Sequence, residues 1–452
     1  MTVQEQSREL WEQLEALIAS GDVSAAELLL SSISASEKTR ILHRLNEQAN
    51  HQLVELLTPL SAAELVEDLP DEQAAGLLDD LAPGDAAAIL DIMNSADQAD
   101  VLSHLDEAEA EEILAHMIPE EAEDARRLLQ HDEDSAGGMM VTEFFGYPET
   151  MTVGAVFKDL RARRDYYSNY QVVYLYTVDE EGRLSGVVRV REVLLAELGM
   201  KLAVLTRRKP VRLMASANLE EMSRAFDTHA FQAIPVVDIA GKLIGAVERR
   251  SVLEAVDEIA DRRLLLFSGI LGGEEVRSMP FAARTGRRLP WLCINIGLNI
   301  LSASVIAMFQ ETLNEVIILA VFLPIISDMS GCSGNQAVAV SIRELAHGLL
   351  MPREIMRVVI KEGQVGLCNG LLLGTIIGCF AAVWKDDVTL GLVLGGAFSI
   401  NCLFAVCLGG CIPMVLKRVG VDAALASSPL LTTLTDMVGF FLVLGSASLY
   451  LI

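Results

Sequence analysis

The C-terminal part of the chain consists of long apolar stretches separated by short basic loops. Five such stretches cover residues 289–309, 316–342, 365–383, 388–416 and 423–452. Three of them carry no charged residue, and the other two carry one aspartate each, Asp328 and Asp436. At a helical rise of about 1.5 Å per residue, each stretch can cross a hydrocarbon core of about 30 Å. The pattern therefore predicts five transmembrane helices in residues 289–452.

The distribution of basic residues predicts the orientation of these helices. Lys and Arg occupy the segment before the first stretch and the loops between the second and third and between the fourth and fifth. The opposite side has only Lys385. Because basic loops stay in the cytoplasm, the N-terminus is expected to be cytoplasmic and the C-terminus extracytoplasmic, in a multi-pass protein of the cell (inner) membrane.

A different period appears in the N-terminal part, where apolar residues recur at every twelfth position in two rows. One row is Leu53, Leu65, Leu77, Ile89, Val101 and Ile113, and the other is Leu57, Leu69, Leu81, Met93, Leu105 and Met117. The rows are four residues apart, so each unit is predicted to be one short helix. A period of twelve rather than seven favours a small superhelical domain, residues 1–130, over a coiled coil.

The charge of this first part is strongly acidic. The whole chain has a formal charge of −27, and residues 279–452 contain 10 acidic and 10 basic residues, so the excess lies entirely in residues 1–278. Residues 46–124 contain no Lys or Arg. Nucleic acid is not expected as a partner, because its phosphates would be repelled by such an acidic surface. The surface has two interpretations: it keeps the domain soluble, or it binds cations.

A second repeat has a period of 59 residues. LYTVDEEGRLSGVV (175–188) returns as IPVVDIAGKLIGAV (234–247), which aligns Asp179 with Asp238 and Gly182 with Gly241. Both copies read as a strand, a tight turn and a strand. The pair resembles tandem CBS domains, an α/β module, at residues 131–200 and 201–262.

The whole chain resembles the MgtE family of magnesium transporters. The resemblance is carried by PIISDMSGCSGNQAVAVSIRELAHG (324–348), by GVDAALASSPLLTTLTDMVG (420–439), and by the order of the parts. That order includes a connecting (plug) helix expected at 263–288. The resemblance implies a homodimer in the lipid bilayer that is not an enzyme but a Mg²⁺-selective, channel-like transporter, with a pore lined by the second and fifth spans.

Asp436 is the predicted Mg²⁺ site of that pore. Near the middle of a membrane a bare aspartate costs about 3 kcal/mol on insertion scales, so something cationic or aqueous should face it. Mg²⁺ takes octahedral oxygen ligands and keeps several waters, so one carboxylate from each subunit suffices. Thr432 and Asn335 are further candidate ligands. The other interpretation of Asp436 is a protonated or helix-bonded structural residue.

The resemblance also implies that cytoplasmic Mg²⁺ closes the pore by bridging acidic faces. The candidate residues for this regulatory site are Asp85, Asp91, Glu254, Asp257, Glu258 and Asp422. Arg249 and Arg250 depart from the family pattern, which often places acidic residues there. We expect them to form ion pairs with the helical domain and to replace part of the bound Mg²⁺.

Regulation by ATP is the other implied property. Tyr174 and Phe231 match aromatic positions that flank adenine in nucleotide-binding members, and Arg191 with Glu192 matches a pair near the phosphate and ribose. The aromatic residues can equally be part of the CBS core, because burial of an aromatic ring is favourable by itself.

Two other functions stay open. Cys332 and Ser428 stand where the family commonly has asparagine, so a broader divalent cation transporter for Co²⁺ or Mn²⁺ is one alternative. A membrane-anchored CBS sensor that transports nothing is the second, but such an anchor needs no carboxylate inside the membrane.

Overall fold

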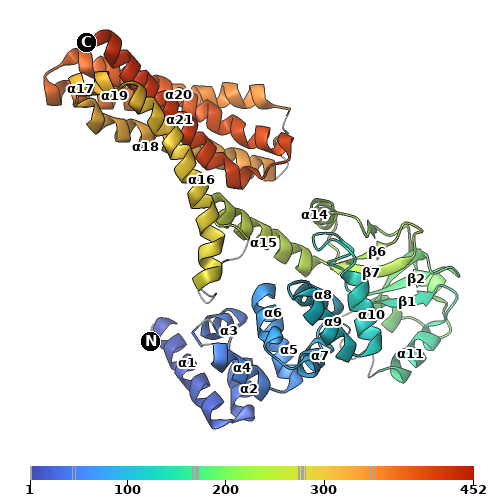
Figure 1. The fold of residues 1–452 in the computed structure, drawn as a ribbon. Coiled ribbons are helices and arrows are strands. Elements are labelled where there is room, and N and C mark those ends of the chain that lie inside the picture. The colour runs from blue at the N-terminus through green and yellow to red at the C-terminus, as the bar shows by residue number, and fades with distance from the viewer. Residues whose placement is uncertain are drawn as a thin grey trace. The chain divides into compact units, whose positions relative to one another are not determined.

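The computed structural model describes residues 3–42, 44–45, 47–164, 167, 170, 173–272, 275, 279, 281–346, 349–351 and 353–452. The chain forms two compact units, Met1–Glu258 and Ile259–Ile452, which are described separately. Figure 1 shows helices in both units and strands in the first unit. We call the second unit the membrane unit.

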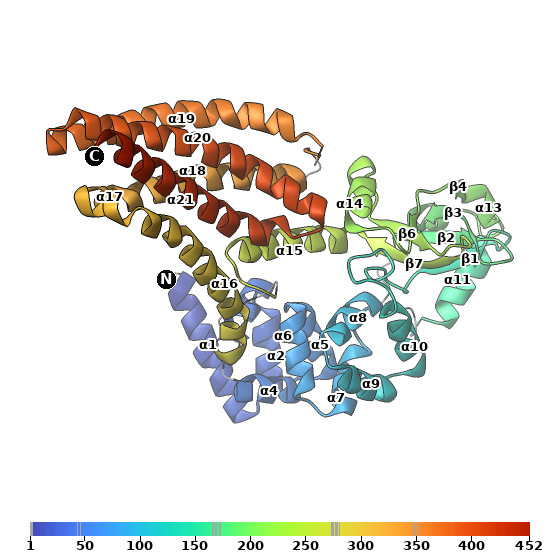
Figure 2. The same cartoon turned by 45° about the horizontal axis from the view of Figure 1, so that its top comes forward.

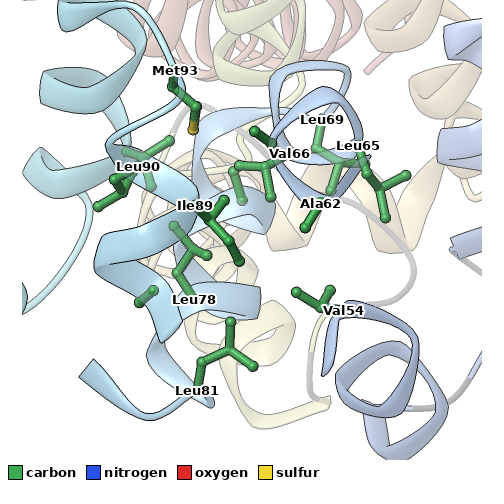
Figure 3. Packing of buried hydrophobic residues seen from close by; sticks show 14 of the residues in the cluster. Val54, Ala62, Leu65, Val66, Leu69, Leu78, Leu81, Ile89, Leu90 and Met93 are labelled. Atoms are coloured by element: carbon green, nitrogen blue, oxygen red, sulfur yellow. The ribbon is translucent and has the colours of Figure 1, made fainter. Parts of the chain in front are cut away.

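The first unit begins with short helices, as the twelve-residue period predicts. They are α1 (Val3–Ser20), α2 (Val23–Ser31), α3 (Ala35–Leu42), α4 (Glu47–Leu56), α5 (Pro59–Glu67), α6 (Asp71–Asp79), α7 (Pro83–Leu90), α8 (Ser95–Ser103), α9 (Glu107–His116) and α10 (Pro119–Leu128). Each repeat unit supplies one helix, from α4, which carries Leu53, to α9, which carries Ile113. Figure 3 shows Leu65 and Val66 of α5 in the same apolar core as Leu78 of α6 and Ile89 of α7.

Proline and polar caps separate these helices. Pro59, Pro83 and Pro119 occupy first-turn positions, where a missing N–H costs nothing. The side chains of Thr58 and Asn94 accept hydrogen bonds from backbone N–H groups at the starts of α5 and α8. The local sequence therefore ends one helix and begins the next at each repeat.

Two small sheets follow. The first has the strand order β1 (Phe145–Pro148), β2 (Tyr174–Val178), β3 (Leu184–Arg189), β4 (Arg207–Arg208), and the second has the order β5 (Leu213–Met214), β6 (Ala233–Val237), β7 (Leu243–Glu248). Helices α11 (Val153–Ala162), α12 (Val190–Leu194), α13 (Leu202–Leu205) and α14 (Leu219–Thr228) accompany them. This is the expected pair of α/β modules.

The two modules contact each other through their equivalent hairpin turns. Gly182 and Gly241 adopt φ values of 79° and 82°, a left-handed conformation that favours glycine. The backbone N–H of Leu184 donates to the carbonyl of Gly241, and that of Leu243 donates to the carbonyl of Gly182, both at 3.1 Å. The 59-residue repeat thus corresponds to an internal pair with matched contacts.

Residues 263–288 do not form the single connecting helix that the sequence suggested. Helix α15 spans Arg249–Phe267, and α16 begins only at Phe281 (Phe281–Met308). Gly269 and Gly272 lie directly after α15 with φ values of 80° and 100°. Glycine in this conformation commonly ends a helix, and it does so here.

The membrane unit contains α16, α17 (Gln310–Glu315), α18 (Leu319–Ala346), α19 (Ile355–Lys385), α20 (Val388–Val419) and α21 (Ala423–Tyr450). Among the described residues, four helices are long and apolar enough to cross a membrane: α16, α19, α20 and α21. The fifth predicted span corresponds to α18, which has 28 residues but is more polar. Its buried residues include Ser330, Ser333 and Gly334, and it contacts α20 and α21, side by side in Figures 1 and 2.

Candidate functional site

Asp436 lies in the interior of the membrane unit. It belongs to α21, its exposed fraction is 7%, and its Oδ1 accepts a hydrogen bond of 2.5 Å from the Ser327 hydroxyl on α18. A hydrogen bond to a carboxylate stabilises its charged form. The sequence identified the aspartate but not Ser327, because a serine in an apolar helix has no distinctive pattern.

The other two predicted pore residues have different surroundings. Thr432, one turn before Asp436, donates its hydroxyl to the Ser428 carbonyl at 3.0 Å, which leaves the oxygen lone pairs available. Asn335 of α18 has a buried Oδ1 without a hydrogen-bond partner among the described residues. It is eight residues beyond Ser327, about 12 Å along the helix, so one protomer does not bring Asn335 to Asp436.

Within the first unit, the predicted regulatory residues are not gathered into one metal site. In the part of the chain that the structure describes, no group of three or more His, Cys, Asp or Glu residues could hold a metal ion. Asp422 accepts hydrogen bonds from the N–H groups of Ala424 and Leu425 and caps α21. Asp91 accepts from the N–H of Ile118, whereas Asp85 and Asp257 are exposed.

An acidic cluster that the sequence did not single out surrounds Arg250 at the start of α15. Arg250 forms an ion pair of 2.7 Å with Glu254, and it interacts electrostatically with Asp97 and Asp68 of the helical domain. Burial and neighbouring carboxylates raise the pKa of Glu67 to about 7. We use the name Arg250 cluster for Glu67, Asp68, Asp97, Glu248, Arg250 and Glu254.

Asp100 lies in the same region, on α8. Burial, reinforced by Asp71, Asp97, Glu133 and Glu258, raises the pKa of its carboxyl to about 8. Asp97 also has a raised pKa, first because of burial. These residues bring charge from the helical domain, the CBS segment and the first turns of α15 together, so a cation would relieve the repulsion.

Arg249 differs from the sequence-based expectation. Its guanidinium donates hydrogen bonds to the carbonyls of Phe226, His229 and Phe231, and it lies 5.1 Å from the centre of the Phe226 ring. It therefore stabilises the second CBS module instead of pairing with the helical domain. The physical reason is that three carbonyl acceptors, at the end of α14 and in the residues just after it, satisfy a planar guanidinium.

The predicted nucleotide-binding residues come from both CBS modules. The Tyr174 hydroxyl lies 3.4 Å from the backbone N–H of Gln232, which follows Phe231, so the two aromatic positions lie near each other. Phe231 stacks on His229 with 5.1 Å between the ring centres. Glu192 forms a 2.7 Å ion pair with Arg207, and Arg191 is exposed on α12.

Long apolar helices joined to a pair of α/β modules define a multi-pass membrane protein, and comparisons with known proteins identify its family. The family model described as "Divalent cation transporter" matches residues 323–446, the "MgtE intracellular N domain" matches 22–134, and the "CBS domain" matches 136–199 and 203–258. The chain belongs to the MgtE family of magnesium transporters.

Curated relatives and solved structures agree with this assignment. Magnesium transporter MgtE of Thermus thermophilus is 33% identical over 334 residues, which cover 73% of this chain and 72% of the relative. The MgtE of Enterococcus faecalis is 30% identical over 330 residues, with the same coverage of 73% and 72%. These relatives are named as transporters, not as enzymes.

Two solved structures resemble the first part of the chain. The cytosolic domain of the Mg²⁺ channel MgtE in complex with ATP has a TM-score of 0.50 and 28% identity, and covers 54% of this chain and 99% of that one. The soluble part of a magnesium transporter has a TM-score of 0.50, 22% identity and coverage of 56% and 99%, and it supports the fold alone.

Proposed function

We propose that the chain is a Mg²⁺-selective, channel-like transporter whose permeation pathway contains Asp436. The observation that carries this proposal is a buried carboxylate inside the membrane unit with a hydroxyl donor from a second helix. Mg²⁺ is the transported substrate. The waters of a hydrated Mg²⁺ ion can donate hydrogen bonds to the carboxylate, with Thr432 as a further oxygen ligand.

The proposed functional unit is a homodimer in which each subunit contributes its Asp436. One carboxylate does not neutralise a divalent cation, whereas two carboxylates do. Asn335 is proposed to belong to another part of the same pathway, since it lies about two helical turns from the Ser327 level. The proposed orientation places the N-terminus in the cytoplasm and the C-terminus outside.

The test is saturable Mg²⁺ uptake by proteoliposomes that contain the full-length chain. Uptake equal to that of protein-free liposomes would favour the membrane-anchored sensor instead. Competition by Co²⁺ or Mn²⁺ at equal concentration would favour the broader divalent cation transporter.

We further propose that cytoplasmic Mg²⁺ regulates closure of the pore, and that Arg250 replaces part of this Mg²⁺. The proposed regulatory residues are Glu254, Asp257, Glu258, Asp85, Asp91 and Asp422. Arg250 is a fixed positive charge close to Asp97 and Asp68. Without it, the carboxylates of the Arg250 cluster would repel each other more strongly. A bound cation would then be required to hold the helical domain against α15.

Arg250→Ala is therefore expected to make protection of the full-length protein from limited proteolysis depend more steeply on Mg²⁺ than in the wild type. The Mg²⁺ concentration that protects the protein should rise several-fold, which is the size of effect expected for a partly exposed charge. Arg224→Ala is the matched control, because Arg224 also forms an (i, i+4) pair, at 2.8 Å with Glu220. A less steep dependence in Arg250→Ala would contradict the proposal.

ATP is proposed as a regulatory ligand of the CBS pair, at Tyr174, Phe231, Arg191 and Glu192. The support is the proximity of Tyr174 to the Phe231 segment and the resemblance to an ATP-bound relative. Calorimetry on the full-length protein should detect ATP binding that Tyr174→Ala weakens by at least about tenfold through loss of base stacking. Tyr174→Phe keeps the ring and should bind normally, and a wild type that binds no ATP would refute the site.

A further inference from the structure

One buried polar side chain of the membrane unit has no assigned role. Asn401 lies on α20 with an exposed fraction of 0%, and neither its Oδ1 nor its Nδ2 has a hydrogen-bond partner among the described residues. Each unpaired buried polar group costs about 1–3 kcal/mol, so packing alone does not account for an amide at this position. Asn401 is therefore available to bind a polar ligand.

The amide of Asn401 lies against the helix that carries Asp436. A Cβ atom added at Gly439 of α21 would be only 2.6 Å from the Asn401 Nδ2. A helical side chain covers the turn that precedes its own Cα, so a side chain at position 439 would cover the turn containing Asp436. Glycine leaves this place open, and the Asn401 amide occupies it.

A third helix brings another unpaired group to the same level. The Ser327 hydroxyl donates to Asp436, and the Ser333 hydroxyl accepts from the Cys402 thiol at 3.6 Å, next to Asn401. Ser330 lies on the same helical face, midway between these two contacts. Its hydroxyl is buried and has no partner among the described residues. Helices α18, α20 and α21 thus approach one another along the segments that carry Ser330, Asn401 and Asp436.

We propose that Asn401 is a positioning residue for the cation pathway: its amide and the Ser330 hydroxyl bind water that bridges to Asp436. The Nδ2 of the amide can donate a hydrogen bond toward Asp436, and its Oδ1 can accept one from a water bound to the cation. A fixed bridge of this kind holds the carboxylate and the hydration shell in one orientation. Because Mg²⁺ keeps its waters more firmly than Ca²⁺, such a bridge favours Mg²⁺. The inference rests on the proposed function of Asp436.

The test compares Asn401→Leu with the wild type in proteoliposomes. Leucine has the same number of side-chain heavy atoms and the same branching as asparagine but cannot bind water, so Mg²⁺ uptake should fall at least about tenfold and the preference for Mg²⁺ over Ca²⁺ should narrow. Thermal stability of the full-length protein should be unchanged or higher, since an unpaired amide is removed. Asn401→Ser, which keeps a hydroxyl, should restore uptake to within about threefold.

Asn299→Leu is the matched control, because Asn299 is exposed on α16 and its amide donates to the Asn295 carbonyl of the same helix. Unchanged uptake and ion preference in Asn401→Leu would overturn the inference. A joint loss of stability and uptake that Asn401→Ser does not restore would overturn it as well, because the amide would then be structural. Full uptake by Asp436→Asn would instead refute the proposed function, which separates the two failures.

Discussion

Replacing Asp436 by asparagine is expected to abolish Mg²⁺ uptake, by at least about a hundredfold, while the fold is retained. Asparagine has the same shape, and its Oδ1 can still accept the hydrogen bond that Ser327 donates to Asp436. Only the negative charge is lost. In a site shielded from bulk water, a full charge attracts a divalent cation far more strongly than an amide dipole does. Uptake of ²⁸Mg²⁺ by proteoliposomes measures the effect.

Two further variants separate the effect of the charge from other effects of the substitution. Asp386→Asn is the matched control, because Asp386 is exposed after α19 with a φ of 54°, a conformation that asparagine tolerates. It should transport normally. Ser327→Ala keeps the charge but removes the hydroxyl donor, so a smaller loss is expected. Undiminished uptake by a correctly folded Asp436→Asn protein would show that the carboxylate is structural.

The helical domain was predictable because its pattern is local and repeated. Leu65, Ile89 and Val101 are each buried with less than 5% exposure, as the twelve-residue period requires. The CBS pair was predictable for the same reason, since Gly182 and Gly241 mark equivalent turns in both copies. Patterns of this kind depend on residues close in sequence, which a single sequence displays directly.

The polar interior of the membrane unit was harder to predict. Length and charge found the stretch that forms α18, but its polar residues face other helices, and hydropathy does not show which neighbour they meet. Ser327 and Asn401 acquire significance only because α18, α20 and α21 converge near Asp436. These contacts join residues 38 to 109 positions apart, and no local period encodes them.

Arg249 and Arg250 show the same limit at a finer scale. They are adjacent in sequence and identical in chemistry, yet Arg249 binds three backbone carbonyls and Arg250 faces carboxylates. Successive residues at the start of a helix point about 100° apart, which sends the two guanidinium groups to different partners. Composition could predict a basic pair there, but only the packing separates a structural arginine from an electrostatic one.

The stability of the helical domain is expected to fall as the pH rises from about 4 to about 8, and Asp100 is a main cause. Its folded-state pKa is raised to about 8, against an ordinary value of about 3.9 in an unfolded chain. Between these values the folded state binds the proton more tightly than the unfolded state does, so each rise in pH favours unfolding. The loss is complete above about pH 8.

Asp100→Asn should remove this loss, because asparagine imitates the protonated carboxyl at every pH. At pH 8 the variant should be more stable than the wild type by on the order of a few kcal/mol, whereas at pH 4 the two should be alike. Hydrogen exchange of the α8 amides in the full-length protein, corrected for intrinsic rates, measures this difference. Asp85→Asn removes the same charge from an exposed site of α7 and should change little. Equal protection of α8 in wild type and Asp100→Asn at pH 8 would show that Asp100 is not held protonated by burial and by its acidic neighbours.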